Sequence, residues 1–176
     1  MSDINVLKLF AQISVFVFDV DGVLTDGNLL VMPGGHMIRR MNIKDGYALQ
    51  LAVKKKFRVL IISGGNSPEV KERLNKLGVD EVFMNVENKE TLLASYIKKH
   101  NLNASELLFM GDDIPDYKAM QLAGLACCPS DAAMEIKKIS QYISHFNGGT
   151  GCARDVIEKV LKLKGCWSID TEIKSQ

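Results

Sequence analysis

Residues 15–22 read Val15-Phe16-Val17-Phe18-Asp19-Val20-Asp21-Gly22. The apolar run predicts a strand covered on both faces, as in a parallel sheet. Residues i and i+2 of a strand point the same way, so Asp19 and Asp21 can reach one small volume at the strand's end. Carboxylates that close repel each other unless a cation or a proton lies between them, and Mg²⁺ prefers oxygen ligands. The stretch predicts a metal-assisted site in which one aspartate attacks and the other transfers a proton. The alternative is a helix cap in a βα loop, where Asp and Gly are common.

Composition sets the class of protein. The chain has 176 residues, of which 47% are hydrophobic and 24% charged, and its formal net charge is +1. This favours one soluble globular domain and gives no electrostatic footprint for nucleic acid. The four cysteines form no C-x-x-C pair, and reduced thiols are typical of a cytosolic protein. No signal peptide or membrane-length apolar run is visible, so we expect a cytoplasmic protein without a membrane partner.

Short apolar runs alternate with amphipathic patterns. The predicted strands are residues 15–18, 59–62, 81–84, 107–110 and 125–127. The predicted helices are residues 45–55, 67–77, 88–100, 114–123, 132–139 and 153–163. Strands that alternate with helices predict a parallel sheet with helices on both faces. The predicted fold class is therefore α/β, a three-layer Rossmann-like arrangement.

One stretch interrupts this alternation. Residues 28–31 and 36–41 are rich in β-forming residues and flank Met32-Pro33-Gly34-Gly35, which predicts a β-hairpin insertion over about residues 28–41. The gaps between the strands leave no room for a cap domain. We therefore predict one domain over residues 1–165 and a tail over residues 166–176.

Polar residues follow each of the first four predicted strands. Besides Asp19 and Asp21, these are Ser63-Gly64-Gly65-Asn66, Asn88-Lys89 and Gly111-Asp112-Asp113-Ile114-Pro115-Asp116. Ligands bind at the carboxyl ends of parallel strands, so these groups should converge at one edge. Each group alone has a plain explanation as a turn or a cap. Together they suit phosphoryl transfer to a carboxylate, with a hydroxyl, a lysine and backbone amides around the phosphoryl oxygens.

These four segments resemble the four motifs of the haloacid dehalogenase (HAD) superfamily. Asn42-Ile43-Lys44-Asp45-Gly46-Tyr47 and residues 148–156 are similar to segments of one branch, the 3-deoxy-D-manno-octulosonate 8-phosphate (KDO-8-phosphate) phosphatases. The resemblance runs from about residue 15 to residue 163. It implies a HAD-like fold and a phosphatase that works through an aspartyl-phosphate and Mg²⁺, in lipopolysaccharide precursor biosynthesis.

The resemblance also implies residue roles. Asp19 would be the nucleophile, Asp21 the general acid/base, and Ser63 and Lys89 would hold the phosphoryl group. The metal ligands would be Asp19, Asp21 through its backbone carbonyl, and Asp112, with Asp113 and Asp116 as supporting carboxylates. The implied substrate-binding residues are Asp21, Asn42, Ile43, Lys44, Asp45, Gly46, Gly64, Arg73 and Lys89.

Three questions stay open at this level. The family pattern tends to have arginine at the positions of Gly65 and Gln50, so a nine-carbon keto-sugar acid 9-phosphate is an alternative substrate. A phospho-receiver signalling module is a remote alternative, because such modules also phosphorylate an aspartate at a strand end. The resemblance implies a homotetramer whose neighbouring subunits close each active site, and the glycine-rich segment 148–151 would be a mobile element or a plain loop.

Overall fold

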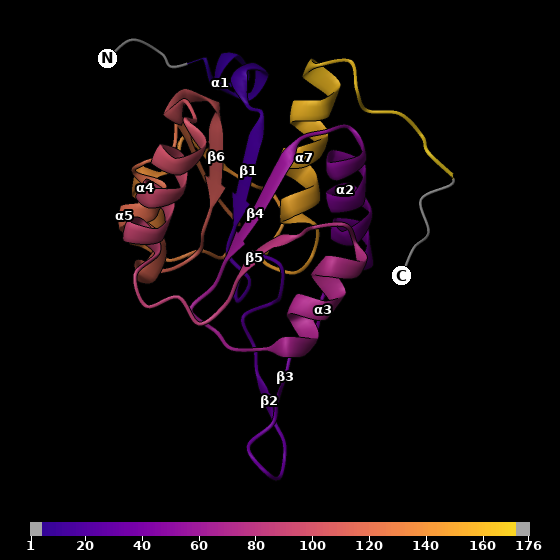
Figure 1. The fold of residues 1–176 in the computed structure, drawn as a ribbon, viewed down its shortest axis with the longest axis vertical. Helices are drawn as coiled ribbons and strands as arrows, with labels where there is room; N and C mark the ends of the chain where they lie inside the picture. Colours follow the sequence, from indigo (N-terminus) through magenta and orange to yellow (C-terminus); the bar gives the residue numbers. More distant parts are fainter. Residues whose placement is uncertain (1–4, 172–176) are drawn as a thin grey trace.

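The computed structural model of the chain describes residues 5–171 and contains a six-stranded parallel sheet. The strand order is β5-β4-β1-β6-β7-β8, with β1 (Val15–Phe18) between β4 (Arg58–Ile62) and β6 (Leu107–Met110). The edge strands are β5 (Glu81–Phe83) and β8 (Tyr142–Ile143), and β7 (Leu125–Cys128) lies between β6 and β8. The predicted α/β class and parallel sheet are confirmed (Figure 1).

Helices cover both faces of the sheet (Figure 1). One face packs against α1 (Val6–Gln12), α2 (Ile43–Lys54), α3 (Pro68–Lys76) and α7 (Cys152–Leu163). The other packs against α4 (Lys89–His100), α5 (Tyr117–Met120) and α6 (Met134–Ile139). Alternate residues of β1 serve the two layers: Phe16 and Phe18 join the first core, Val15 and Val17 the second. Burial on both faces explains why β1 is wholly apolar.

The hairpin stands away from these layers. It consists of β2 (Leu30–Val31) and β3 (Met37–Ile38), which pair antiparallel and project beyond the carboxyl edge of the sheet (Figure 1). Its strands are shorter than the sequence predicts. Its large apolar side chains are exposed, with Leu30 at 60% and Val31 at 69%. Within residues 5–171 no further domain lies over this edge, as expected for a fold without a cap.

Side-chain caps fix the N-termini of α1, α2, α3 and α4. Ser67 caps α3 by accepting the Val70 N–H, with Pro68 at the first helical position. The helix expected from residue 45 begins instead at Ile43, because the Asn42 side chain accepts the Lys44 N–H. Most of the helix expected over residues 114–123 is a 3₁₀ turn (Ile114–Asp116) followed by the short α5. Helix α1 and strand β8 are not predicted from the sequence pattern.

The described part of the predicted tail lies against the domain. Trp167 meets the Tyr47 ring edge-on at 6.3 Å, and the Asp170 carboxylate pairs with Lys54 at 2.6 Å. Residues 1–4 and 172–176, which belong to the predicted domain and tail, lie outside the described residues. None of the helices described over residues 5–171 is both long and apolar enough to span a bilayer.

Candidate active site

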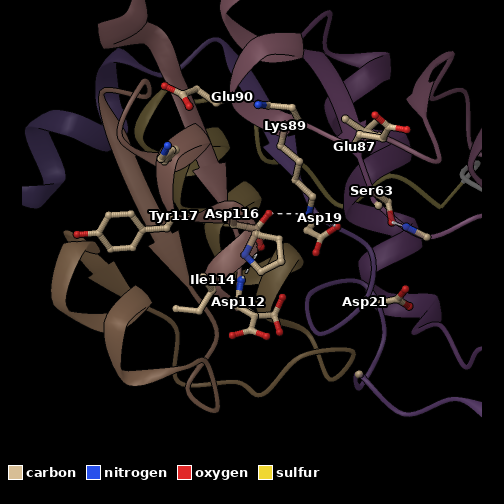
Figure 2. A pocket seen from close by; sticks show the side chains of 18 residues that line it. Asp19, Asp21, Ser63, Glu87, Lys89, Glu90, Asp112, Ile114, Asp116 and Tyr117 are labelled. Atoms are coloured by element: carbon tan, nitrogen blue, oxygen red, sulfur yellow. Dashed lines mark hydrogen bonds and ion pairs between the residues drawn. The ribbon is translucent and has the colours of Figure 1, made fainter.

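The polar segments that follow the strands meet in one cavity of about 620 Å³ at the carboxyl edge of the sheet. It is lined by all of the predicted catalytic residues, metal ligands and supporting carboxylates and by Gly64 (Figure 2): Asp19, Asp21, Ser63, Gly64, Lys89, Asp112, Asp113 and Asp116. Asp19 and Asp21 come from the loop after β1, and Ser63 directly follows β4. Lys89 opens α4, and the last three aspartates follow β6.

A buried lysine joins two buried aspartates at the floor of this cavity. Lys89 Nζ lies 2.9 Å from Asp19 Oδ1 and 2.7 Å from Asp116 Oδ1. Burial alone would lower the pKa of Lys89, but the two neighbouring carboxylates outweigh it and raise that pKa. Lys89 is therefore a fixed cation beside Asp19, at the place where a phosphoryl oxygen would need one.

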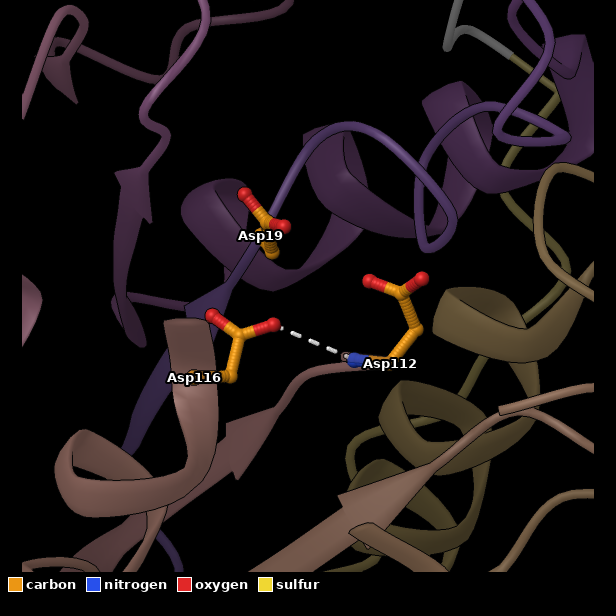
Figure 3. A group of neighbouring side chains, drawn as sticks. All are labelled: Asp19, Asp112 and Asp116. Carbon is orange, nitrogen blue, oxygen red and sulfur yellow. Dashed lines mark hydrogen bonds between the residues drawn. The ribbon is translucent and has the colours of Figure 1, made fainter. Parts of the chain in front are cut away.

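The same aspartates can hold a metal ion. Asp19, Asp112 and Asp116 each offer a carboxylate oxygen, and these oxygens lie within 4.8 Å of one another (Figure 3). Both oxygens of Asp116 already have partners, since Oδ1 pairs with Lys89 and Oδ2 accepts the Asp112 N–H at 3.2 Å. Asp19 and Asp112 are thus the better metal ligands of this group.

The pKa values of these two carboxyls indicate the same need for a cation. Burial and the charge of Asp116, only partly offset by Lys89, raise the pKa of Asp19 to about 7. Burial and the neighbouring carboxylates raise the pKa of Asp112 to about 7 as well. A divalent cation between them would remove the repulsion, and an all-oxygen donor set suits a hard ion such as Mg²⁺.

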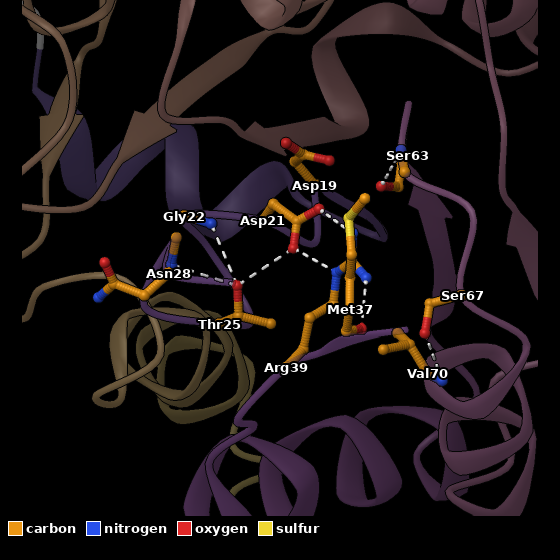
Figure 4. A network of polar contacts seen from close by, with 12 residues as sticks. Asp19, Asp21, Gly22, Thr25, Asn28, Met37, Arg39, Ser63, Ser67 and Val70 are labelled. Atoms are coloured by element: carbon orange, nitrogen blue, oxygen red, sulfur yellow. Dashed lines mark hydrogen bonds and ion pairs between the residues drawn. The ribbon is translucent and has the colours of Figure 1, made fainter. Parts of the chain in front are cut away.

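Asp21 lies at the side of the cavity and forms an ion pair with an arginine that follows the hairpin. The Arg39 guanidinium donates from Nε to Asp21 Oδ1 at 2.7 Å and from Nη2 to Oδ2 at 3.0 Å (Figure 4). Thr25 Oγ1 donates to Oδ1 at 3.4 Å and accepts the Gly22 and Gly27 N–H groups. Arg39 is not among the site residues predicted from the sequence. Its only signal was a charged residue at the end of an apolar hairpin.

Close backbone packing holds the loop that carries Asp21. Gly22 has φ +85°, and a Cβ there would come within 2.0 Å of Asp112 Oδ2, so only glycine fits. A Cβ at Gly148 would come within 2.0 Å of the Gly22 carbonyl, and the Gly149 N–H donates to the Val23 carbonyl at 2.9 Å. Segment 148–151 therefore packs directly against the catalytic loop in this structure.

Most of the residues expected to bind the sugar do not line this cavity. Asn42 caps α2 and donates from Nδ2 to the Gly149 carbonyl at 3.2 Å. Ile43 is exposed, and Lys44 lines a separate hollow beside α7. Asp45 and Gly46 are buried between helices. Arg73 lies in a groove between the hairpin and α3.

Asp45 has a structural contact that its expected role does not explain. It is 2% exposed, and its Oδ1 accepts the Arg154 N–H at 2.7 Å, near the start of α7. Its other carboxylate oxygen is buried without a hydrogen-bond partner among the described residues. Burial, partly offset by backbone hydrogen bonds, raises the pKa of Asp45 to about 6.

The Asp45→Asn variant tests this placement. A carboxyl whose pKa rises from 3.8 to about 6 on folding stabilises the native state fully below pH 3.8, and this contribution is lost as pH rises through 6. The loss is about 3 kcal/mol at neutral pH, at about 1.4 kcal/mol per pH unit. Urea unfolding should show the variant gaining stability relative to the wild type between pH 4 and pH 7. A difference that does not change with pH would contradict a buried, ionisable Asp45.

Comparisons with known proteins agree with this fold and site. Residues 81–155 match the model of the haloacid dehalogenase-like hydrolases. The KDO-8-phosphate phosphatase KdsC of Salmonella typhi is 28% identical over 161 residues, covering 92% of this chain and 86% of the relative. The crystal structure of the KDO-8-phosphate phosphatase of Moraxella catarrhalis, in complex with magnesium, phosphate and KDO, superposes with a TM-score of 0.86. The Moraxella chain is 30% identical in sequence, and the match covers 90% of this chain and 91% of the Moraxella chain.

A parallel sheet with aspartates, a serine and a lysine gathered at its carboxyl edge defines a HAD-type phosphohydrolase, so the chain is a phosphoric monoester hydrolase. Both relatives named above match it over nearly its whole length. Within this superfamily, the chain belongs to the KDO-8-phosphate phosphatase family.

Proposed function

We propose that the chain is a Mg²⁺-dependent phosphatase that hydrolyses KDO-8-phosphate to KDO and phosphate in lipopolysaccharide precursor biosynthesis. The observation that carries the proposal is the meeting of Asp19, Asp21, Lys89 and Asp112 in one cavity. The relatives that match over nearly the whole chain support the substrate. We place the reaction in the cytoplasm, in keeping with the four unpaired cysteines.

In the proposed reaction, Asp19 attacks the phosphorus and forms an aspartyl-phosphate. Asp21 gives a proton to the departing sugar oxygen and then takes one from the water that hydrolyses the intermediate. Lys89 and Ser63 hold the phosphoryl oxygens, and Asp116 fixes Lys89. Mg²⁺ held by Asp19, Asp112 and the Asp21 backbone carbonyl would supply positive charge that offsets the repulsion between nucleophile and phosphate.

We further propose that the enzyme works as a homotetramer. The hairpin exposes Leu30, Val31, Met37 and Ile38, and contiguous exposed apolar side chains mark interaction surfaces. A second subunit near the open cavity would also shield the intermediate from bulk water. The exposed residues Ile43 and Lys44 would then contact substrate in the assembled sites, although in the single chain they lie outside the cavity. Sedimentation equilibrium measures the assembled mass directly, and a monomer or dimer at micromolar concentration would contradict the tetramer.

A phosphate-release assay against a panel of sugar phosphates tests the activity. KDO-8-phosphate should give the highest kcat/KM, activity should vanish in excess EDTA, and Mg²⁺ should restore it. Gly65 stands where the family pattern has an arginine, so the nine-carbon keto-sugar acid 9-phosphate belongs in the panel. A higher kcat/KM for the nine-carbon acid than for KDO-8-phosphate would mean that the nine-carbon acid is the substrate, while the proposed reaction mechanism would be unchanged. A long-lived phosphorylated protein without turnover would contradict the phosphatase assignment.

A further inference from the structure

Arg39 is buried although the hairpin that carries it is exposed. It follows β3 directly, and its side chain is 6% exposed while Met37 and Ile38 are each more than half exposed. The guanidinium faces Asp21 with two parallel N–H groups, one to each carboxylate oxygen. This two-pronged geometry is specific to arginine and gives a strong, oriented pair.

The guanidinium stands at the boundary between the catalytic cavity and a second hollow. An ideal Cβ at Gly65 would lie 2.9 Å from Asp21 Oδ2 and 3.0 Å from Arg39 Nη2, so glycine lets the pair approach the cavity wall. Asp21 and Gly65 line the catalytic cavity, whereas Arg39 lines the groove between the hairpin and α3. A leaving group that extends from Asp19 past Gly65 would therefore meet Arg39.

The groove beyond Arg39 is large enough for a sugar and has positive charge at its wall. Its volume is about 1040 Å³, and it also contains Arg73 and Ser67, with Glu69 as its one acidic side chain. Three arginines, Arg39, Arg40 and Arg73, line the groove against that one carboxylate. This excess of positive charge makes the groove better suited to an anionic ligand than to a neutral one.

The Arg39–Asp21 pair conflicts with the work proposed for Asp21. Asp21 must contact the oxygen of the leaving group, yet both of its carboxylate oxygens are taken by Arg39. Arg39 cannot simply turn away, because a buried guanidinium without an anionic partner is strongly disfavoured. A carboxylate on the substrate would supply that partner, and a neutral sugar would not.

We propose that Arg39 is a specificity-determining residue that exchanges the Asp21 carboxylate for the carboxylate of the substrate. A leaving group that carries a carboxylate forms an ion pair with the Arg39 guanidinium, and the released Asp21 carboxyl can then contact the scissile oxygen. A neutral leaving group leaves the pair closed and is turned over slowly. This inference rests on the proposed function, because it requires a sugar acid phosphate as substrate.

The test compares matched acidic and neutral substrates in Arg39→Gln. In the wild type, kcat/KM should be higher for KDO-8-phosphate than for fructose 6-phosphate. In the variant this preference should shrink by roughly 10- to 100-fold, the range for lost hydrogen bonds to a charged group. The kcat/KM for the acidic substrate should fall, whereas the kcat/KM for the neutral substrate should stay the same or rise. Calorimetry should show weaker binding of free KDO, with inorganic phosphate binding unchanged.

Two further variants keep the test sharp. Arg39→Lys retains the charge without the two-pronged geometry and should keep part of the preference, even if Arg39→Gln folds poorly. Lys76→Gln removes a cation of α3 that lies outside the groove, is 63% exposed and pairs with Glu72, and it should leave the preference unchanged. An equal loss for acidic and neutral substrates in Arg39→Gln would overturn the inference, because it would mean that Arg39 only positions Asp21.

The outcome separates this inference from the proposed function. If the wild type does not hydrolyse KDO-8-phosphate, the proposed function fails. The exchange can still be measured with 6-phosphogluconate and sorbitol 6-phosphate, two open-chain sugar phosphates that differ only in carrying a carboxylate or a CH2OH group at C1. A wild type that shows no preference for the acidic member of either pair would overturn the exchange itself.

Discussion

Phosphatase activity should fall by roughly 10⁴-fold or more in Asp19→Asn, as expected when a nucleophile is removed. An amide cannot attack phosphorus to form the acyl-phosphate, and its side chain is a poorer ligand for a hard cation. The wild type should also give a hydroxylamine-sensitive phosphorylated intermediate during turnover, which the variant lacks. Phosphate release and acid-quench labelling measure the two effects.

Two controls separate lost chemistry from lost structure. Without metal, Asp19→Asn should unfold at the same temperature as the wild type or higher at pH 8. The reason is that the raised pKa of Asp19 makes its ionised form unfavourable in the folded state above about pH 7. Glu87→Gln makes the same chemical change in the cavity lining, at an exposed position, and should keep its activity within about twofold. Full activity in Asp19→Asn would remove Asp19 from the reaction.

Phosphatase activity should fall less in Asp21→Asn than in Asp19→Asn. The expected loss is roughly 10²- to 10⁴-fold, which is the usual contribution of a general acid/base. Asparagine can still accept a hydrogen bond from Arg39, so the local geometry is largely retained. The loss should be smallest for p-nitrophenyl phosphate, whose leaving group needs little protonation. An equal loss for that ester and for a sugar phosphate would contradict the proton-transfer role of Asp21.

The sequence predicts the sheet and its polar edge well because both follow from local patterns. The apolar runs identify the five long strands, and parallel strands place their carboxyl ends at one edge. The short elements were missed, since α1 and the two-residue β8 form only through contacts made in the folded chain. Strand and helix patterns therefore suffice to place Asp19, Ser63, Lys89 and Asp112 in one cavity.

The surroundings of the site are less predictable for the same reason. Arg39 reaches Asp21 across 18 positions of sequence, through a hairpin whose orientation no local pattern encodes. Likewise, Asp45 is only visible as a buried contact of α7 once α2 and α7 are packed together. Residues 42–46 resemble a substrate-binding segment, yet the single chain places them outside the cavity. Sequence similarity carries no information on which of these side chains the folding of one subunit buries.

Lys89→Met should produce the other large effect, because it removes the only cation that contacts Asp19 and Asp116 among the described ion pairs. Activity should fall by roughly 10²- to 10³-fold, as when a donor to the transition-state charge is lost. The fold should be weakened by about 3–5 kcal/mol at pH 8 without metal, since breaking a buried ion pair leaves uncompensated charge. Lys118→Met, at an exposed lysine of the same cavity, should change neither quantity appreciably.

The pH dependence identifies the cause of that weakening. Burial raises the pKa of Asp116, and the charge of Lys89 offsets part of this rise. Loss of the lysine therefore raises the pKa of Asp116 further. An acidic group with a raised native pKa stabilises the fold at low pH and loses that contribution as pH rises. The stability difference between Lys89→Met and the wild type should therefore grow from pH 5 to pH 8.

A second substitution tests whether charge, rather than packing, is responsible. Adding Asp116→Asn to Lys89→Met removes one of the uncompensated carboxylates and should recover part of the lost stability. The gain should be larger than any change that Asp116→Asn causes in the wild type, where Lys89 still offsets that carboxylate. Urea unfolding of the four proteins at pH 8 gives this coupling directly. If the effects of the two substitutions on the free energy of unfolding simply add, Lys89 contributes through packing alone and the electrostatic account of the site is wrong.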